Sequence, residues 1–512
     1  MSWEPNRLEE NRLEKLARLR EAGIEPYPLR SGRTHTVAAA VELFEKLETS
    51  TPEGEAIPQE TVTVTGRLVS FRDMGKSVFG HIEDGTGRIQ LFARREEVGE
   101  EAHLQLRKLT DLGDFVEVTG YLVRTRTGEI SVRASGWRML AKALSPLPVI
   151  KEEQDEDGNT VRHGGFSDVE ERYRQRYADL AVNPEVRETF RIRARMISAL
   201  RRYMDDHDFL EVETPVLQPI YGGAAARPFT TYHNQLKQEL YLRISFELYL
   251  KRLLVGGFER VYEIGRDFRN EGVSYKHNPE FTQLEFYAAY WDYNDVMDFV
   301  EGMVRYAAQE VLGTTVVHFR GNAIDLGQKW HRITLRDAIQ EFAGIDYVQY
   351  PDADSLRAAI RAKGGQAPSD ATWGRLVDNL MGDYVEPHLI QPTFLTQYPR
   401  DISPFAKKLP ADSTHVERFE MFFGGMEMGN AFTELNDPLD QAERFTEAAQ
   451  MYAAEDDEHA PVDEDYLRAM RYGMPPNGGF GMGVDRLAIL FANQPNIREV
   501  LLYPHLRDKD AE

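Results

Sequence analysis

The segment Phe268-Arg-Asn-Glu-Gly-Val-Ser-Tyr-Lys-His-Asn-Pro-Glu-Phe281 decides the fold class when it is paired with Gly478-Gly-Phe-Gly-Met-Gly-Val-Asp-Arg486, far downstream. Each segment offers one arginine, Arg269 or Arg486, close to glycine-bearing backbone that can turn tightly. Two guanidinium forks from distant parts of a chain suit the oxygens of a polyphosphate. A surface ion pair is the alternative for either arginine alone, so the two segments together predict a nucleotide-phosphate site.

The second segment predicts a glycine-lined strand that leads into a helix. The glycines end at Gly483, and an apolar run begins at Leu487 and ends at Phe491. Arg486 therefore falls in the first turn of the helix. Glycine lets a ligand approach the backbone closely, and the N-terminus of a helix favours anions. Tight packing of the strand against the helix is the alternative explanation.

A third segment, Arg418 to Glu434, predicts a β-hairpin with a carboxylate on each strand. The turn Gly424-Gly425 pairs Phe422 with Glu427 and Glu420 with Gly429. This register places Glu420 and Glu427 on one face as diagonal neighbours. Carboxylates together with substrate phosphates are the usual way in which proteins hold Mg²⁺. The hairpin therefore predicts a magnesium site, with an exposed sheet face as the alternative.

Two further polar residues of this hairpin do not fit a regular strand. Strict alternation would send Asn430 and Glu434 to the face opposite Glu427. A bulge near Gly429 would bring all of them to one pocket, and glycine permits a bulge.

Composition limits the class of protein. The chain has 512 residues and no cysteine, which excludes disulfides, thiolate zinc sites and cysteine nucleophiles. Its start shows no secretory signal, and no apolar run approaches the ~20 residues of a membrane span, so we expect a cytoplasmic protein with no membrane partner. The net charge of −23 is unevenly spread: residues 62–143 carry 13 Lys+Arg against 11 Asp+Glu. Such an N-terminal domain can still bind RNA.

The pattern of turns and alternating residues predicts four regions and an α+β fold. A helix is expected at 5–22 within a helical extension at 1–60. Short strands separated by glycine turns predict a five-stranded β-barrel of the oligonucleotide-binding type (OB-fold) at 61–145. A linker is expected at 146–183, with a polar run at 151–165. The region 184–512 mixes strands and helices without strict alternation, which predicts a domain built on an antiparallel sheet.

The first part of the last region predicts a helix at 186–208 followed by a strand at 209–215. Phe190, Ala194, Ile197, Leu200 and Met204 recur at helical spacing and would share one apolar face.

These segments together resemble the class II aminoacyl-tRNA synthetases, and in detail the bacterial lysyl-tRNA synthetases. Phe268 to Phe281 and Gly478 to Arg486 are similar to the second and third motifs of that class. The helix and strand that end at Pro215 resemble the first motif, which forms a homodimer interface. The stretches 222–229 and 429–437 match the lysine enzymes more closely than the aspartate or asparagine members.

The resemblance implies roles for individual residues. Arg269, Glu271 and Arg486 would be the catalytic residues, with Mg²⁺ on Glu420 and Glu427. ATP would contact Arg269, Glu271, His277, Phe281, Glu420, Glu427, Gly481 and Arg486. L-Lysine would contact Gly223, Glu247, Glu285, Tyr287, Asn430 and Glu434. The barrel would bind the anticodon of tRNA(Lys) through Arg72, Phe79, Gln90 and Glu129.

The implied function is lysine–tRNA ligation, a carbon–oxygen bond-forming ligase reaction that uses ATP. A pocket with Glu247, Glu285 and Glu434 suits a substrate with two amines and would repel an aspartate side chain. An aspartyl- or asparaginyl-type enzyme is the first alternative. A second alternative is a relative that transfers lysine to a protein. Such relatives lack the barrel, which this chain is expected to have. A non-catalytic RNA-binding homologue would be expected to have lost an arginine or a metal-binding carboxylate.

Overall fold

The computed structural model describes residues 3–148, 151–154, 160–163, 166, 168–452 and 461–508. The chain divides into two compact units, Met1–Asp168 and Val169–Glu512, which are treated separately below. The polar run expected at 151–165 lies partly outside the described residues, which include only a short antiparallel ribbon of β6 (Lys151–Gln154) and β7 (Thr160–His163) there.

The first unit contains a closed five-stranded barrel with the strand order β1-β2-β3-β5-β4. Alternate residues of each strand, such as Val62 and Val64, are fully buried and fill its interior with aliphatic side chains. The OB-type barrel expected from the sequence is thus confirmed. Its strands are β1 (Thr61–Asp73), β2 (Ser77–Glu83), β3 (Arg88–Arg94), β4 (Phe115–Arg124) and β5 (Ile130–Ala141).

Four helices accompany the barrel. The helix expected at 5–22 is α1 (Arg7–Glu21), which begins at a capping box formed by Asn6 and Glu9. The sequence analysis did not anticipate α2, whose Phe44 is buried in the barrel core. The other three helices are α2 (Val37–Ser50), α3 (Arg95–Val98) and α4 (Glu100–Leu109).

The second unit is built on an eight-stranded sheet with the order β16-β17-β18-β19-β20-β13-β12-β8. Neighbouring strands are antiparallel except at the two ends, where β16 pairs with β17 and β8 with β12 in parallel. The expected antiparallel-sheet domain is therefore confirmed. The strands are β8 (Leu210–Glu211), β12 (Arg260–Phe268), β13 (Glu280–Ala289), β16 (His331–Thr334), β17 (Thr393–Thr396), β18 (Arg418–Phe423), β19 (Met426–Thr433) and β20 (Asn477–Gly483).

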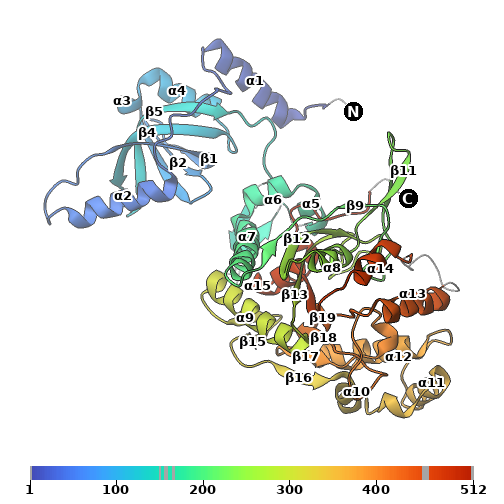
Figure 1. Cartoon of the computed structure of the whole chain (residues 1–512). Helices are drawn as coiled ribbons and strands as arrows, with labels where there is room; N and C mark the ends of the chain where they lie inside the picture. Colours follow the sequence, from blue (N-terminus) through green and yellow to red (C-terminus); the bar gives the residue numbers. More distant parts are fainter. Residues whose placement is uncertain are drawn as a thin grey trace. The chain divides into compact units, whose positions relative to one another are not determined.

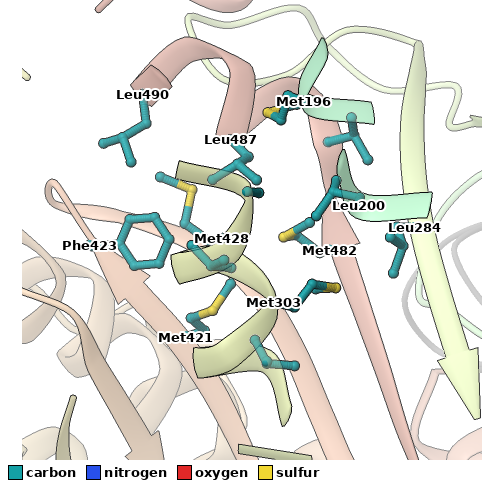
Figure 2. Packing of buried hydrophobic residues seen from close by; sticks show 14 of the residues in the cluster. Met196, Leu200, Leu284, Met303, Met421, Phe423, Met428, Met482, Leu487 and Leu490 are labelled. Carbon is teal, nitrogen blue, oxygen red and sulfur yellow. The ribbon is translucent and has the colours of Figure 1, made fainter. Parts of the chain in front are cut away.

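Three helices pack on one face of this sheet. Side chains from α7 (Pro184–Asp205), α9 (Tyr293–Leu312) and α15 (Val484–Phe491) form one apolar cluster with the central strands. Figure 2 shows Leu200, Met303 and Leu487 from these helices meeting Leu284 and Met482 from the sheet. On the other face, α8 (Glu247–Val255) packs against Val261 and Tyr287, and the central strands line a cavity beside it.

The remaining helices and short strands surround this core (Figure 1). A separate apolar cluster fills the long insertion between β16 and β17. None of the helices described is both long and apolar enough to cross a membrane. The remaining elements are α5 (Val169–Arg174), α6 (Arg176–Val182), β9 (Leu217–Gln218), β10 (Thr230–His233), β11 (Gln238–Leu242), β14 (Val316–Phe319), β15 (Asn322–Asp325), α10 (Leu335–Ala343), α11 (Ala353–Ala362), α12 (Trp373–Leu380), α13 (Pro438–Tyr452) and α14 (Glu464–Arg471).

Two expectations about the start of this unit need correction. The buried stripe of α7 contains Met196, Leu200 and Met204, whereas Ala194 is exposed. The stripe is displaced because the helix packs against both α9 and α15. The strand expected at 209–215 is only Leu210–Glu211, because the chain leaves the edge of the sheet toward Pro215.

Candidate active site

A cavity of about 1330 Å³ lies on the face of the sheet opposite the helices. Twelve of the fourteen residues that the sequence analysis assigned to ATP and lysine line this cavity. They are Gly223, Glu247, Arg269, Glu271, His277, Phe281, Glu285, Tyr287, Glu427, Asn430, Gly481 and Arg486. Glu420 and Glu434 do not line it, although both are buried close to residues that do.

The hairpin of β18 and β19 contains the bulge that the polar pattern required. Phe422 pairs with Glu427 as expected, but the register then shifts, so that Glu420 pairs with Asn430 instead of Gly429. Met428 is the additional residue, and its side chain is buried in the core. The expected pairing of Glu420 was therefore wrong by one residue, whereas the bulge itself is confirmed. It places Glu420 and Asn430 on the cavity face together.

The cavity face consists of matching positions on neighbouring strands. One row runs from Glu420 through Asn430 and Gly481 to Glu285. The next row includes Gly479 beside Tyr287. A methyl group at Gly479 would collide with the Glu434 carboxylate and the Tyr287 ring, and one at Gly481 would come within 3.0 Å of Gln283 Nε2. Glycine on β20 therefore leaves room for polar groups from both neighbouring strands.

One end of the cavity holds Arg486 in the first turn of α15, as the sequence predicted. Its Nη1 donates to the Glu427 carbonyl at 2.7 Å and to Glu427 Oε2 at 3.0 Å, and its Nη2 lies 3.2 Å from His277 Nε2. Burial opposes ionisation of Glu427, but the Arg486 guanidinium and the neighbouring Lys276 outweigh it and lower the pKa of Glu427. The ion pair between Arg486 and Glu427 therefore holds both side chains in place.

His277 is neutral at physiological pH. Burial, together with the charges of Arg486 and Lys276, lowers the pKa of His277 to about 4. Because Arg486 can only donate, Nε2 of His277 accepts, and Nδ1 donates to Ser274 Oγ at 2.8 Å. His277 therefore orients the arginine without adding positive charge.

Arg269 lies in the loop after β12 and faces the ring expected to stack on adenine. Its guanidinium carbon is 5.1 Å from the centroid of Phe281, and its Nε donates to the Ile244 carbonyl at 3.4 Å. The two residues therefore lie together beside Glu271 at the cavity wall.

Glu420 lies next to Arg418, a residue that the sequence analysis did not assign to the site. Arg418 donates to Glu420 Oε1 at 2.6 Å and to Asn430 Oδ1 at 3.0 Å, and Tyr398 OH donates to Glu420 Oε2 at 2.9 Å. Burial raises the pKa of Glu420 to about 7; Arg418 opposes this rise, and the charge of Glu427 adds to it. Arg418 could have been anticipated because it lies two residues before Glu420 on the same strand face.

The fit of Glu420 and Glu427 to a metal ion depends on these charges. The carboxylates are close enough for Glu427 to raise the pKa of Glu420, so a divalent cation between them would relieve repulsion. Within the described part of the chain, no group of three or more His, Asp or Glu side chains could hold a metal by itself. Two carboxylates that are completed by substrate phosphates match the usual coordination of Mg²⁺.

The other end of the cavity is strongly acidic. Glu285 Oε1 accepts from Ser245 Oγ at 2.9 Å and from Gln283 Nε2 at 2.8 Å, and its Oε2 accepts from Tyr287 OH at 3.3 Å. Burial raises the pKa of Glu285 well above its usual range, and the nearby charges of Asp267 and Glu247 add to the rise.

Beneath this end lies a buried lysine that the sequence analysis missed. Lys251 Nζ bonds Glu247 Oε1 at 2.6 Å and forms an ion pair with Glu434. Burial raises the pKa of Glu434 to about 8, although Lys251 opposes the rise. Lysine is almost always exposed, so only its position four residues after Glu247 on α8 hinted at this contact.

A second candidate site lies on the barrel. One row of paired residues runs across it: Arg72, Phe79, Phe92, Arg133 and Tyr121. The rings of Phe79 and Phe92 stack at 4.6 Å. Aromatic rings flanked by arginines suit stacked nucleic-acid bases. Phe92 was not assigned from the sequence, although strand alternation places it on the same face as Gln90.

The neighbouring row of the barrel brings Gln90 and Glu129 together. Gln90 Nε2 donates to Glu129 Oε2 at 2.5 Å, and Ser131 Oγ donates to Gln90 Oε1 at 2.8 Å. His81 Nε2 lies 2.6 Å from Glu129 Oε1. Three of the four residues that were expected to bind an anticodon, Arg72, Phe79 and Gln90, thus lie on two adjacent rows, and Glu129, just before β5, contacts the second row through Gln90 and His81.

The fold is that of a class II tRNA synthetase. Residues 168–507 match the family described as tRNA synthetases class II (D, K and N), and residues 62–140 match the family described as OB-fold nucleic acid binding domain. The chain is 52% identical over 508 residues to a lysine--tRNA ligase of Roseiflexus sp. (strain RS-1), covering 99% of this chain and 100% of the relative. It is 50% identical over 510 residues to the lysine--tRNA ligase of Chloroflexus aurantiacus, again covering 99% and 100%. The chain therefore belongs to the lysine--tRNA ligase family.

Proposed function

We propose that the chain joins L-lysine to tRNA(Lys) at the expense of ATP, in the cytoplasm and as a homodimer. The observation that carries the proposal is the acidic end of the cavity, where Glu247, Glu285 and Glu434 converge with one internal ammonium. Lysine brings an amine at each end of its side chain and can satisfy such a site. An aspartate substrate would be repelled, because Lys251 is already paired and does not line the cavity.

In the first step, a carboxylate oxygen of lysine attacks the α-phosphate of ATP, and the bond to pyrophosphate breaks. Arg269 holds the α-phosphate and the lysine carboxylate, whereas Arg486 holds the γ-phosphate. Glu271, His277 and Gly481 position ATP, and adenine stacks on Phe281. The chain supplies no nucleophile; orientation and neutralisation of charge lower the barrier.

Glu420 and Glu427 would hold the Mg²⁺ that accompanies ATP, and this ion would supply positive charge against the phosphates. Lysine is held by Glu247 and Glu285 at the amino-acid amine, by Asn430 at the carboxylate, and by Glu434, with Tyr287 beside it, at the ε-ammonium. Gly223 also contacts lysine.

In the second step, a hydroxyl of the terminal ribose of tRNA attacks the lysyl carbonyl, and AMP leaves. The barrel, as the anticodon-binding domain at 61–145, selects the tRNA through Arg72, Phe79, Gln90 and Glu129. The preceding residues 1–60 form a helical extension, and 184–512 form the catalytic domain.

Transfer of radiolabelled lysine to tRNA tests this proposal. The purified chain should charge tRNA(Lys) with lysine when ATP and Mg²⁺ are present, and should leave tRNA(Asp) and tRNA(Asn) uncharged. Charging of either of those tRNAs with its own amino acid would favour the aspartyl- or asparaginyl-type alternative. A protein that binds tRNA(Lys) but charges no tRNA would be a non-catalytic homologue.

A further inference from the structure

Lys251 is completely buried at the acidic end of the cavity. Its side chain has 0% exposure, as does that of Glu434, and the side chain of Glu247 has 7%. The aromatic rings of Phe405, Tyr287 and Phe432 surround its ammonium, with centroids 5.0, 5.7 and 5.8 Å from Nζ. A buried charge is costly unless it is paired, so the site must hold this ammonium firmly between the two carboxylates.

The ammonium reaches these carboxylates from the side away from the cavity. Glu247 lines the cavity, whereas Lys251 and Glu434 do not. Lys251 bonds Oε1 of Glu247, and it pairs with Oε2 of Glu434. Glu434 Oε1 has no hydrogen-bond partner in the described structure, and it lies against Gly479, which lines the cavity. Each carboxylate therefore has one oxygen paired with Lys251 and a second oxygen that can accept a hydrogen bond from a substrate.

The charges at this end do not cancel. Glu247, Glu285 and Glu434 supply three carboxylates, and Lys251 supplies one ammonium. Arg418, whose charge favours ionisation of Glu247, is engaged by Glu420 and Asn430. The charge of Asp267, which acts on Glu285, is offset by Arg243 and Arg269. Two negative charges therefore remain when all three carboxylates are ionised. Lysine, with its α- and ε-ammonium groups, brings two positive charges.

We propose that Lys251 is a specificity-determining positioning residue. Its ammonium is a fixed counter-ion that pairs with Glu247 and Glu434 from the side away from the cavity. The net charge of the three carboxylates and this ammonium is then minus two. An amino acid with two positive charges matches that net charge. This inference rests on the proposed function and deepens it. Without Lys251, the three carboxylates repel one another and take up protons, so the site no longer favours an ammonium over a neutral side chain.

Lys251→Met, which keeps the length of the side chain and removes the charge, tests this role. Lysine binding is measured by calorimetry without ATP, and the KM for lysine is measured by pyrophosphate exchange between pH 6.5 and 8.5. At pH 7 we expect both the Kd and the KM for lysine to rise at least ~10-fold, with the KM for ATP nearly unchanged. Because the carboxylates lose a cation that favours ionisation, the defect should shrink as the pH rises. The preference for lysine over L-norleucine should fall as well.

Lys142→Met is the matched control. Lys142 has 0% side-chain exposure and bridges Asp111 and Asp114 in the other unit. The control should destabilise the first unit but leave the pH dependence of lysine binding unchanged. If Lys251→Met does not fold, Lys251→Met combined with Glu434→Gln removes both partners of the pair. This double variant keeps two carboxylates, so it should fold and bind lysine.

Three outcomes separate this inference from its rivals. Tighter lysine binding by Lys251→Met would overturn it and identify Lys251 as a tethered occupant that competes with the substrate. Unchanged lysine affinity with an unchanged pH profile would reduce Lys251 to a structural residue. If the unaltered chain itself neither binds nor activates lysine, the proposed function fails, independently of Lys251.

Discussion

Arg486 and Arg269 are held in different ways by the surrounding protein. Arg486 is fixed by the Glu427 carbonyl, the Glu427 carboxylate and the neutral His277. Arg269 has one long hydrogen bond and a stacked ring. Preorganisation of donors reduces the reorganisation needed in the transition state. Arg486 is therefore the residue at which a single change most clearly tests phosphate binding.

Replacing Arg486 by glutamine should lower kcat/KM for ATP by ~10²–10³-fold in pyrophosphate exchange, because a preorganised donor to the phosphates is lost. Lysine binding measured without ATP should change little. Arg468→Gln, which removes an exposed arginine on α14, serves as the control. Normal ATP kinetics in Arg486→Gln would contradict a role for Arg486 in binding the phosphates.

The pH dependence of lysine binding follows from the acidic end of the cavity. Burial raises the pKa of Glu434 to about 8 and raises that of Glu285 well above its usual range. A protonated carboxyl cannot pair with an ammonium, so binding releases protons and is favoured at higher pH. The KM for lysine should therefore fall by up to ~10-fold per unit as the pH rises from 6.5 to 8.

Glu434→Gln provides the comparison, since it removes one of the titrating groups. Its KM should be higher, and the dependence on pH shallower. A KM in the unaltered chain that is constant across this range would contradict the proposed role of these carboxylates. His277, with a pKa of about 4, should contribute nothing in this window.

At the scale of elements, strand β20 divides the sheet into a packed face and a catalytic face. Phe480 and Met482 point into the core, whereas Gly479 and Gly481 leave space for polar side chains on the cavity face. The missing side chains of Gly479 and Gly481 therefore make room for the polar side chains of the neighbouring strands.

Gly479→Ala should abolish lysine-dependent exchange, because the added methyl group would displace Glu434 and Tyr287. A loss of stability of ~1–3 kcal/mol is expected from overpacking, measured by denaturant unfolding. Gly483→Ala is the matched change on the same strand, where the nearest atom is 3.6 Å away, and it should fold normally. Normal lysine kinetics in Gly479→Ala would contradict the crowding described here.

Much of this element-scale architecture was accessible from the sequence because it depends on local rules. The turn at Gly424-Gly425 and the strand-to-helix step before Arg486 were predicted from spacing alone. The position of the bulge was not, because packing of Met428 into the core decides it. Lys251 was missed for a related reason: its spacing from Glu247 is the one local signal, and its burial depends on Tyr287, Phe405 and Phe432 from other segments. The ATP and lysine assignments came mainly from family resemblance.

At the scale of the whole molecule, the chain separates selection of the tRNA from activation of the amino acid. The barrel carries Phe79 and Phe92 in one stack, and the residues proposed for catalysis all belong to the second unit. The first chemical step should therefore be independent of the barrel face.

Phe79→Ala and Phe92→Ala should each raise the KM for tRNA(Lys) by ~10–100-fold, since a base-stacking contact contributes ~1–3 kcal/mol. Lysine-dependent exchange measured without tRNA should be unchanged. Phe115→Ala, at an exposed phenylalanine on β4, is the control and should alter neither measurement. Unchanged charging kinetics in both variants would show that tRNA does not bind this face of the barrel.

The most direct test of the central claim is amino-acid-dependent exchange of radiolabelled pyrophosphate into ATP, with Mg²⁺ and without tRNA. Lysine, arginine, aspartate and asparagine are compared at equal concentration. We expect exchange with lysine and none above background with the other three. Exchange with aspartate or asparagine would contradict the lysine assignment and leave the fold intact. No exchange with any of the four, in folded protein that binds ATP, would contradict the assignment of the cavity as a synthetase active site.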